Sequence, residues 1–391
     1  MKEQLEQIKQ YMKDHEAEMM AQYEEFVNMQ DFWRDVDDVN AVGEWLKKNF
    51  EAEGFDCRLI DVGDKAGRIL TGTLGAERGG KPIIFAGHMD TALSPDLFEE
   101  NPFRVEDGKV YGPGVLDMKG GILISLYVAK ALNAIGYNER PIKILYVGDE
   151  EGCHLYSDCS PLIVEESKGG LFAFNMETGL PDNALCIGRK GRIGIDIFTT
   201  GIEAHAGNDF TAGISAIEEM AHKILELQAL TDLEAGTTVN VGVVKGGTIA
   251  NAIPAECMIS VDIRFTTMAE KERIEKALKD VCSMTFVKGT STRYELTTVM
   301  APYETTDGVK KLFGFVNETA EKFGLPVMDG RVLGGCSDAA YTTIAGTPCL
   351  CSCGVRGEWN HTVREYAIAE SMGERVVLWS AAILNAGAFE A

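Results

Sequence analysis

Histidine and acidic side chains follow several apolar runs of this chain. The first run, PIIFAG, is followed by His88 and Asp90. Successive side chains of a strand point to opposite faces, so these two residues, two positions apart, project on the same side. A histidine beside a carboxylate is typical of a metal ligand whose ring is held by its neighbour. The pattern therefore indicates a candidate metal site at the end of this strand.

Further carboxylates stand at comparable places. Glu150 and Glu151 follow the run IKILYVG, Glu177 follows LFAFNM, and Asp117 lies in the glycine-rich loop YGPGVLDMKGG. Since the carboxyl ends of parallel strands share one crevice, groups far apart in sequence can meet there. His361, in the loop after TPCLCS, is the second histidine that can join them.

A crevice with so many carboxylates needs a cation. The like charges would repel one another and raise their own pKa values unless a positive ion lay among them. Two histidines with several carboxylates suit zinc, and two ions roughly 3.5 to 4 Å apart, bridged by a carboxylate and a water, form a hydrolytic centre. The residue types thus predict metal-dependent hydrolysis.

The elements that must position these residues alternate between strands and helices. Strands are expected at CRLIDV, GRILTGTL, PIIFAG, IKILYVG, LFAFNM and TPCLCS. Amphipathic or buried helices are expected over residues 1–27, 39–50, 119–135, 309–324 and 365–384. This order favours an α/β layer architecture with a largely parallel sheet.

The middle of the chain follows another pattern. Strand-like runs RIGIDIFTT, TTVNVGVV, ECMISVDIRF and TRYELTTV are interrupted by two helical stretches, 212–229 and 269–282. They predict a small α+β domain over residues 191–303, inserted in a discontinuous domain of residues 1–190 and 304–391. At 391 residues, the chain exceeds what a single hydrophobic core usually supports.

The composition indicates which binding partners are unfavourable and which cellular compartment is favoured. The formal charge of -23 opposes binding to nucleic acid or to an anionic membrane surface. No run reaches the roughly 18 to 20 apolar residues of a membrane span, and the charged first 27 residues lack a signal peptide's apolar core. Ten cysteines without such a signal favour reduced thiols in the cytoplasm.

An ordered series of motifs resembles metallopeptidase family 20, the group that includes aminoacylase, acetylornithine deacetylase, succinyl-diaminopimelate desuccinylase and glutamate carboxypeptidase. The motifs are GHMD, GVLDMKGG, GDEEG, METG, EAHAG, KGGTIANAIPAE, DIR, GGCSDAA and EWNHT. The resemblance implies a zinc-peptidase catalytic domain, with a mixed, mostly parallel sheet flanked by helices, and an inserted lid domain that often mediates a homodimer.

The resemblance also implies a role for each motif residue in a site for two zinc ions, with cobalt or manganese as substitutes. His88 and Glu177 would bind one ion, and Glu151 and His361 the other. Asp117 would bridge both. Asp90 would orient the ring of His88, and Glu150 would be the general base. The lid would add His205 at the scissile carbonyl oxygen, and substrate would be held by Arg264, Asn251, Gly335 and Ser337.

These roles predict hydrolysis of an amide bond in a peptide or an N-acyl amino acid. Glu150 would take a proton from a metal-bridging water and later deliver it to the leaving nitrogen. The planar donors of Arg264 suit a free α-carboxylate, which favours a carboxypeptidase or an amino-acid deacylase. An aminopeptidase or dipeptidase of the same family is an alternative.

Two readings from other classes stay open. A non-catalytic metal- or peptide-binding protein could use the same fold. A thiol site could use Cys349, Cys351 and Cys353, although buried packing explains small apolar cysteines well.

Some residues near the motifs are expected to have ordinary roles. His154, in the unusual stretch CHLYSDCS after GDEEG, matches nothing in the family pattern, and Asp149 is interpreted as solvated or supporting charge.

Arg356 and Trp359 lie close enough in sequence to His361 to touch substrate.

Overall fold

The computed structural model describes residues 1–390, which form two compact units. The first unit comprises Met1–Gly188, Thr305–Leu333 and the described residues of 337–390. The second comprises Arg189–Glu304 and Gly334–Cys336. The second unit is therefore almost entirely a single insertion into the first.

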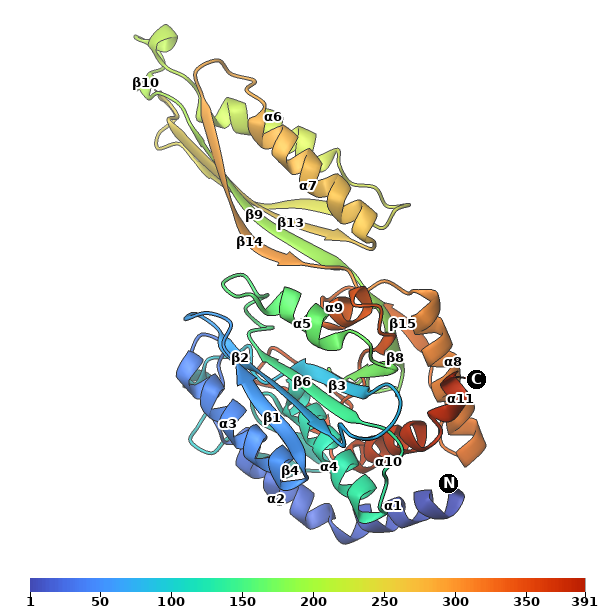
Figure 1. The fold of residues 1–391 in the computed structure, drawn as a ribbon. Helices are drawn as coiled ribbons and strands as arrows, with labels where there is room; N and C mark the ends of the chain where they lie inside the picture. Colours follow the sequence, from blue (N-terminus) through green and yellow to red (C-terminus); the bar gives the residue numbers. More distant parts are fainter. Residues whose placement is uncertain (391) are drawn as a thin grey trace. The chain divides into compact units, whose positions relative to one another are not determined.

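A six-stranded mixed sheet is the centre of the first unit (Figure 1). Its strands, in spatial order, are β1 (Phe55–Ile60), β2 (Gly67–Leu74), β6 (Ile142–Gly148), β3 (Ile83–His88), β7 (Phe172–Asn175) and β16 (Cys349–Leu350). The last four strands run parallel to one another, whereas β2 is antiparallel to both of its neighbours. The predicted α/β class with a mixed, mostly parallel sheet is confirmed.

The parallel strands are apolar because both faces of the sheet are covered. Every residue of β3 and β7 is buried, as expected for parallel strands with helices on both faces. The helices of this unit are α1 (Lys2–Asp14), α2 (Glu16–Val27), α3 (Val36–Ala52), α4 (Gly120–Ala134), α5 (Cys159–Ser167), α8 (Asp307–Phe323), α9 (Ala339–Ile344), α10 (Glu370–Leu384) and α11 (Gly387–Glu390). Helix α3 packs on β1 and β2, and α4 packs on α10.

Several details differ from the sequence-based expectations. The first 27 residues form two helices rather than one, because the chain leaves helical geometry at His15. The run TPCLCS is a strand only at Cys349–Leu350, yet its cysteines Cys349 and Cys351, and Cys353 directly after it, are fully buried. Burial raises the pKa of the Cys353 thiol well above its ordinary value, which agrees with packing rather than thiolate chemistry.

Short strands that the sequence analysis did not anticipate complete the first unit. One sheet has the order β17 (Gly357–Glu358), β18 (Tyr366–Ile368), β5 (Lys109–Tyr111) and β4 (Arg104–Glu106). A separate pair joins β15 (Gly330–Leu333) to β8 (Leu185–Arg189). Strands of two or three residues are too short to produce a readable two-residue period.

The second unit is built on a four-stranded antiparallel sheet with two helices on one face (Figure 1). The strand order is β11 (Thr238–Gly246), β13 (Glu256–Phe265), β9 (Gly191–Thr200) and β14 (Ser291–Met300), and the helices are α6 (Ala216–Gln228) and α7 (Met268–Ser283). Buried residues alternate along β13, and its apolar face packs with both helices in one core. A small pair, β10 (Ala204–His205) with β12 (Ala252–Ile253), lies outside this sheet.

None of the helices in residues 1–390 is both long and apolar enough to cross a membrane.

Candidate metal centre

Three adjacent parallel strands deliver the candidate ligands to one edge of the sheet. Strand β3 ends at His88, β6 is followed by Asp149 to Glu151, and Glu177 stands two residues after the end of β7. Because β3 pairs with β6 on one side and β7 on the other, these strand ends are neighbours. The convergence that the sequence analysis expected is present.

One histidine and two carboxylates form the first set. The Nε2 atom of His88 lies 3.1 Å from Oδ1 of Asp117 and 3.4 Å from Oε1 of Glu177. All three residues are buried. Their ligand atoms face one another rather than the surrounding protein.

A second set shares Asp117 with the first. The Nε2 atom of His361 lies 3.2 Å from Oδ2 of Asp117 and 3.2 Å from Oε1 of Glu151. One oxygen of Asp117 therefore faces each histidine. This is the arrangement expected of a carboxylate that bridges two ions.

The spacing of these atoms fits a bound metal. Two ligands at about 2.05 Å from a tetrahedral ion are about 3.3 Å apart, close to the distances in both sets. In addition, the polar partner of the buried oxygen Oε1 of Glu151 is the proposed ligand atom Nε2 of His361. Buried carboxylates gathered this closely are costly unless a cation compensates them, so the residues fit a dinuclear centre.

The shifted pKa values of these residues also fit a bound metal. Burial, followed by the charge of Asp117, raises the pKa of Glu151 to about 7. Hydrogen bonds to Asp117 and Glu151 raise the pKa of His361 to about 11. Burial lowers the pKa of His88, but the carboxylates around its ring outweigh burial and the net shift is upward. Protons held between closely spaced histidines and carboxylates are displaced when a metal binds.

Asp90 supports both His88 and the glutamate pair. The backbone carbonyl of Asp90 lies 2.9 Å from Nδ1 of His88, and its carboxylate oxygen Oδ1 lies 3.5 Å from the same atom. The carboxylate accepts hydrogen bonds from the backbone N–H groups of Glu150 and Glu151. Asp90 is therefore in a position to orient the ring mainly through its carbonyl, while its side chain holds the turn that follows β6.

Glu150 lies beside the ligands without joining either set. One carboxylate oxygen of Glu150 is within 4.8 Å of ligand atoms of His88 and Glu151. Burial raises the pKa of Glu150 well above its ordinary value, and the neighbouring carboxylates Glu177 and Asp338 add to this shift. A carboxyl group with a raised pKa next to a metal centre is suited to exchange protons near neutrality.

Two supporting residues were missed by sequence reasoning. Asn360 donates a 2.9 Å hydrogen bond from Nδ2 to Oδ2 of Asp117. The buried carboxylate of Glu365 accepts hydrogen bonds from the backbone N–H groups of Leu116 and Asp117, at 2.7 and 2.9 Å. The only available signal was their closeness in sequence to His361, which did not reveal that both hold Asp117.

Most of the predicted substrate-binding residues belong to the second unit. The ring nitrogen Nδ1 of His205 accepts hydrogen bonds from the backbone N–H groups of Gly207 and Asn208, which leaves Nε2 for another partner. The guanidinium of Arg264 donates from Nε to Oδ1 of Asp262, at 2.8 Å. Asn251 is exposed.

The motif GGCSDAA is divided between the units. Gly335 belongs to the second unit, where a side chain at this position would come 3.5 Å from Nη1 of Arg189. Ser337 belongs to the first unit and is buried. Its hydroxyl accepts a hydrogen bond from the backbone N–H of Ala339 and lies 3.4 Å from Sγ of Cys351.

A family profile and several known sequences are similar to this chain. The profile of peptidase family M20/M25/M40 matches residues 84–385. Carboxypeptidase G2 of a Pseudomonas species is 27% identical over 379 residues, which cover 96% of this chain and 91% of that protein. Acetylornithine deacetylase of Proteus mirabilis is 29% identical over 253 residues, which cover 58% of this chain and 59% of that protein.

Solved structures show the same fold. Aminopeptidase PepT of Bacillus cereus superposes with a TM-score of 0.77 at 21% identity, covering 95% of this chain and 99% of that one. An M20 family metallo-carboxypeptidase of Sulfolobus solfataricus superposes with a TM-score of 0.73 at 16% identity, covering 94% of this chain and 98% of that one.

Proposed function

This chain belongs to peptidase family M20/M25/M40 and is a hydrolase, and we propose that it uses two zinc ions to cleave an amide bond next to a free α-carboxylate. The substrate would be a peptide cut at its C-terminal residue or an N-acyl amino acid. Cobalt or manganese could replace zinc in the same ligand sets. Relatives named as a carboxypeptidase and as a deacetylase support this range of substrates.

The sharing of Asp117 between the two histidines carries the proposal. His88 and Glu177 would hold one ion with Oδ1 of Asp117, and His361 and Glu151 the other with Oδ2. Bound in these sets, the ions would supply positive charge that lowers the pKa of a water molecule and polarises a carbonyl oxygen.

The remaining chemistry belongs to Glu150. Its raised pKa and its place beside both ligand sets suit a group that accepts a proton from the attacking water and delivers it to the leaving nitrogen. Asp90 would keep this turn in place through its hydrogen bonds to the backbone of Glu150 and Glu151.

The second unit would bind the substrate and act as a lid. His205 would donate from Nε2 to the scissile carbonyl oxygen, because its Nδ1 already accepts two backbone hydrogen bonds. Arg264, oriented by Asp262, would bind the α-carboxylate with help from Asn251, Gly335 and Ser337. A homodimer formed through this unit, and a cytoplasmic location, are parts of the same proposal.

The function is tested by mass-spectrometric assay of a pool of N-acyl amino acids and dipeptides. Zinc-loaded wild-type protein should release free amino acids. Glu150→Gln keeps the size of the side chain but not the base, so it should bind metal normally and turn over at least about 100-fold slower. The matched control is Glu99→Gln, which changes an exposed glutamate.

Each outcome of this assay has one meaning. Release by wild type and by Glu99→Gln, but not by Glu150→Gln, supports the hydrolase and identifies its substrate class. Equal release by all three proteins contradicts the role of Glu150. Metal-loaded wild type that releases nothing from the pool contradicts the proposed substrate class.

A further inference from the structure

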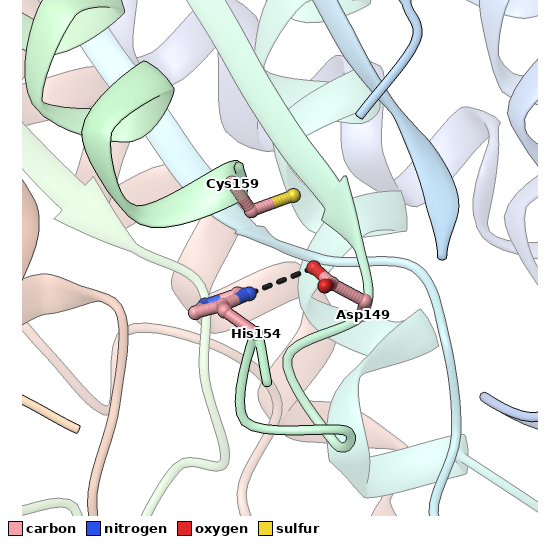
Figure 2. Close-up of side chains that lie close together, drawn as sticks. All are labelled: Asp149, His154 and Cys159. Carbon is pink, nitrogen blue, oxygen red and sulfur yellow. Dashed lines mark hydrogen bonds and ion pairs between the residues drawn. The ribbon is translucent and has the colours of Figure 1, made fainter. Parts of the chain in front are cut away.

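A second histidine cluster lies just beyond the glutamate pair. Nδ1 of His154 lies 2.7 Å from Oδ1 of Asp149, and Nε2 lies 2.7 Å from Oδ1 of Asp338. Figure 2 shows the first of these contacts, with the thiol of Cys159 beside it. All four residues are buried. Nothing in the metal centre described above uses this cluster.

A third metal ion does not fit these residues. The 2.7 Å contacts are hydrogen-bond distances, and they are shorter than the roughly 3.3 Å that separates two ligands of one tetrahedral zinc ion. A ring whose two nitrogens each face a carboxylate oxygen at this distance donates twice and has no lone pair for a metal. His154 is therefore an imidazolium bound between two carboxylates.

Charge balance supports the imidazolium. Burial lowers the pKa of His154, but Asp338 and Asp149 outweigh burial and the net shift is well upward. One buried cation thus compensates two buried carboxylates, which would be costly without it.

The cluster anchors a turn that is strained. Cys153 and His154 have φ values of 55° and 52°, a left-handed conformation that is unfavourable for residues other than glycine. Backbone hydrogen bonds from Cys153 to Glu150 and from His154 to Asp149 close the same turn. Strain of this kind persists only where surrounding contacts hold it, and the two contacts of the His154 ring do so.

This turn carries the proposed base and one proposed ligand. On one side Asp90 holds it through the N–H groups of Glu150 and Glu151. On the other side the ring of His154 links Asp149, directly before Glu150, to Asp338 at the start of α9. Asp338 is also close enough to Glu150 for the two carboxylates to repel each other.

We propose that His154 is a positioning residue of the hydrolase, a buried imidazolium that fixes the turn of Glu150 and Glu151 and neutralises the carboxylates flanking the base. The proposal rests on the proposed function, because it assigns His154 an effect on Glu150. It does not require His154 to touch substrate or metal.

The first test compares His154→Gln with His222→Gln, which removes an exposed histidine of α6. His154→Gln should lower kcat by about 10-fold or more, with KM within about threefold and two metal ions retained per chain, because the base is displaced while the ligands remain. His222→Gln should match wild type. Unchanged kcat in His154→Gln, or a loss fully explained by missing metal, would overturn the proposal.

A second variant separates charge compensation from packing. Adding Asp338→Asn to His154→Gln removes the carboxylate that the lost imidazolium had neutralised, and an asparagine can hydrogen-bond to the new glutamine. The double variant should recover at least about threefold in kcat over His154→Gln. If His154 only filled space, the second change would lower kcat further, and that result would count against the proposal.

A third measurement does not depend on activity. In ¹⁵N-histidine spectra, both ring nitrogens of His154 should carry protons at pH 7, and these signals should vanish in His154→Gln but persist in His222→Gln. A ring with one unprotonated nitrogen would refute the imidazolium. Inactive wild type with a doubly protonated His154 would instead refute the proposed function, so the two failures are distinguishable.

Discussion

In the metal centre each histidine Nε2 lies 3.1 to 3.4 Å from two carboxylate oxygens, whereas each nitrogen of His154 lies 2.7 Å from one. The two clusters adjoin the end of the same strand, β6, and in both of them histidine rings face buried carboxylates. Spacing distinguishes them. The wider spacing in the metal centre leaves room for an ion between the ligand atoms. In the closer cluster, which is the His154 ring with Asp149 and Asp338, the facing atoms are already joined by protons.

The buried carboxylates of both clusters need a cation to compensate their charge. In the second unit a lysine compensates a buried carboxylate. Nζ of Lys223 lies 3.2 Å from Oε1 of Glu219, and both side chains are fully buried. The molecule therefore compensates buried acid with an imidazolium and with an ammonium, and we propose that metal ions do so in the centre. Five predictions test whether the metal centre, the His154 cluster and the Lys223–Glu219 pair differ as their spacing indicates.

The largest effect should come from Asp117→Asn. An asparagine offers one carbonyl oxygen where Asp117 offers an anionic oxygen to each histidine. Metal content should fall below two ions per chain, and turnover should drop roughly 1000-fold, since a metal ion contributes several kcal/mol to the transition state. Metal analysis and the hydrolysis assay measure both, with the exposed Asp64→Asn as control. Two tightly bound ions in the variant would contradict the bridging role.

Lys223→Met should destabilise the second unit without changing metal content. It leaves Glu219 buried with only its backbone hydrogen bonds from Phe286 and Val287, a loss of about 3 kcal/mol or more. Hydrogen exchange of α6 and α7 measures this, with the exposed Lys276→Met as control. Unchanged protection of both helices would contradict the account.

The same ion pair gives a pH dependence with a defined sign. Burial raises the pKa of Glu219, but hydrogen bonds from Val287 and Lys223 outweigh burial and lower it below 4.5. The stabilisation is therefore complete above pH 4.5 and is lost as the pH falls below that value. Wild-type exchange in α6 and α7 should accelerate below pH 4.5 more than exchange in Lys223→Met, after correction for the intrinsic rates.

Asn360→Ala should weaken the metal centre by a smaller amount. The change removes the hydrogen bond to Oδ2 of Asp117 but no ligand. Outer partners of metal ligands typically contribute about 10- to 100-fold in metal affinity, so zinc binding should weaken within that range. Competition with a chromophoric chelator measures it. An affinity equal to that of wild type would show that Asn360 does not hold Asp117.

The smallest effect should come from Cys159→Ala. Burial raises the pKa of this thiol to about 12, so it stays a neutral thiol beside His154 and Asp149. Its loss should leave metal content and kcat unchanged and lower the free energy of unfolding by about 1 kcal/mol. A fall in metal content by one ion per chain would mean that the closer cluster binds metal after all.

The comparison also explains how much the sequence could predict. His88, Asp149 to Glu151 and Glu177 stand at the ends of apolar runs, and the parallel pairing of three strands is enough to bring them together. The bounds of long strands and helices were predicted within a few residues, because each of these elements is long enough to repeat its hydrophobic period several times.

The closer cluster could not be predicted in this way. His154 meets Asp338 across 184 positions of sequence, and Asn360 meets Asp117 across 243. Neither contact follows from a local period or from a shared strand end. Asp149 was interpreted as solvated or supporting charge, and only the second alternative fits, because the residue is buried and bonded to His154. Asp149 lies next to the predicted site, but the sequence does not reveal which partner pairs with it.

The most direct test of the account is a zinc titration of the metal-free protein, followed by the ring ¹⁵N signals of its histidines. Two equivalents of zinc should bind tightly, and the signals of His88 and His361 should change while His154 stays doubly protonated. A ring proton lost from His154 at a third equivalent, or signals of His88 and His361 that do not respond to zinc, would contradict the assignment of the two clusters.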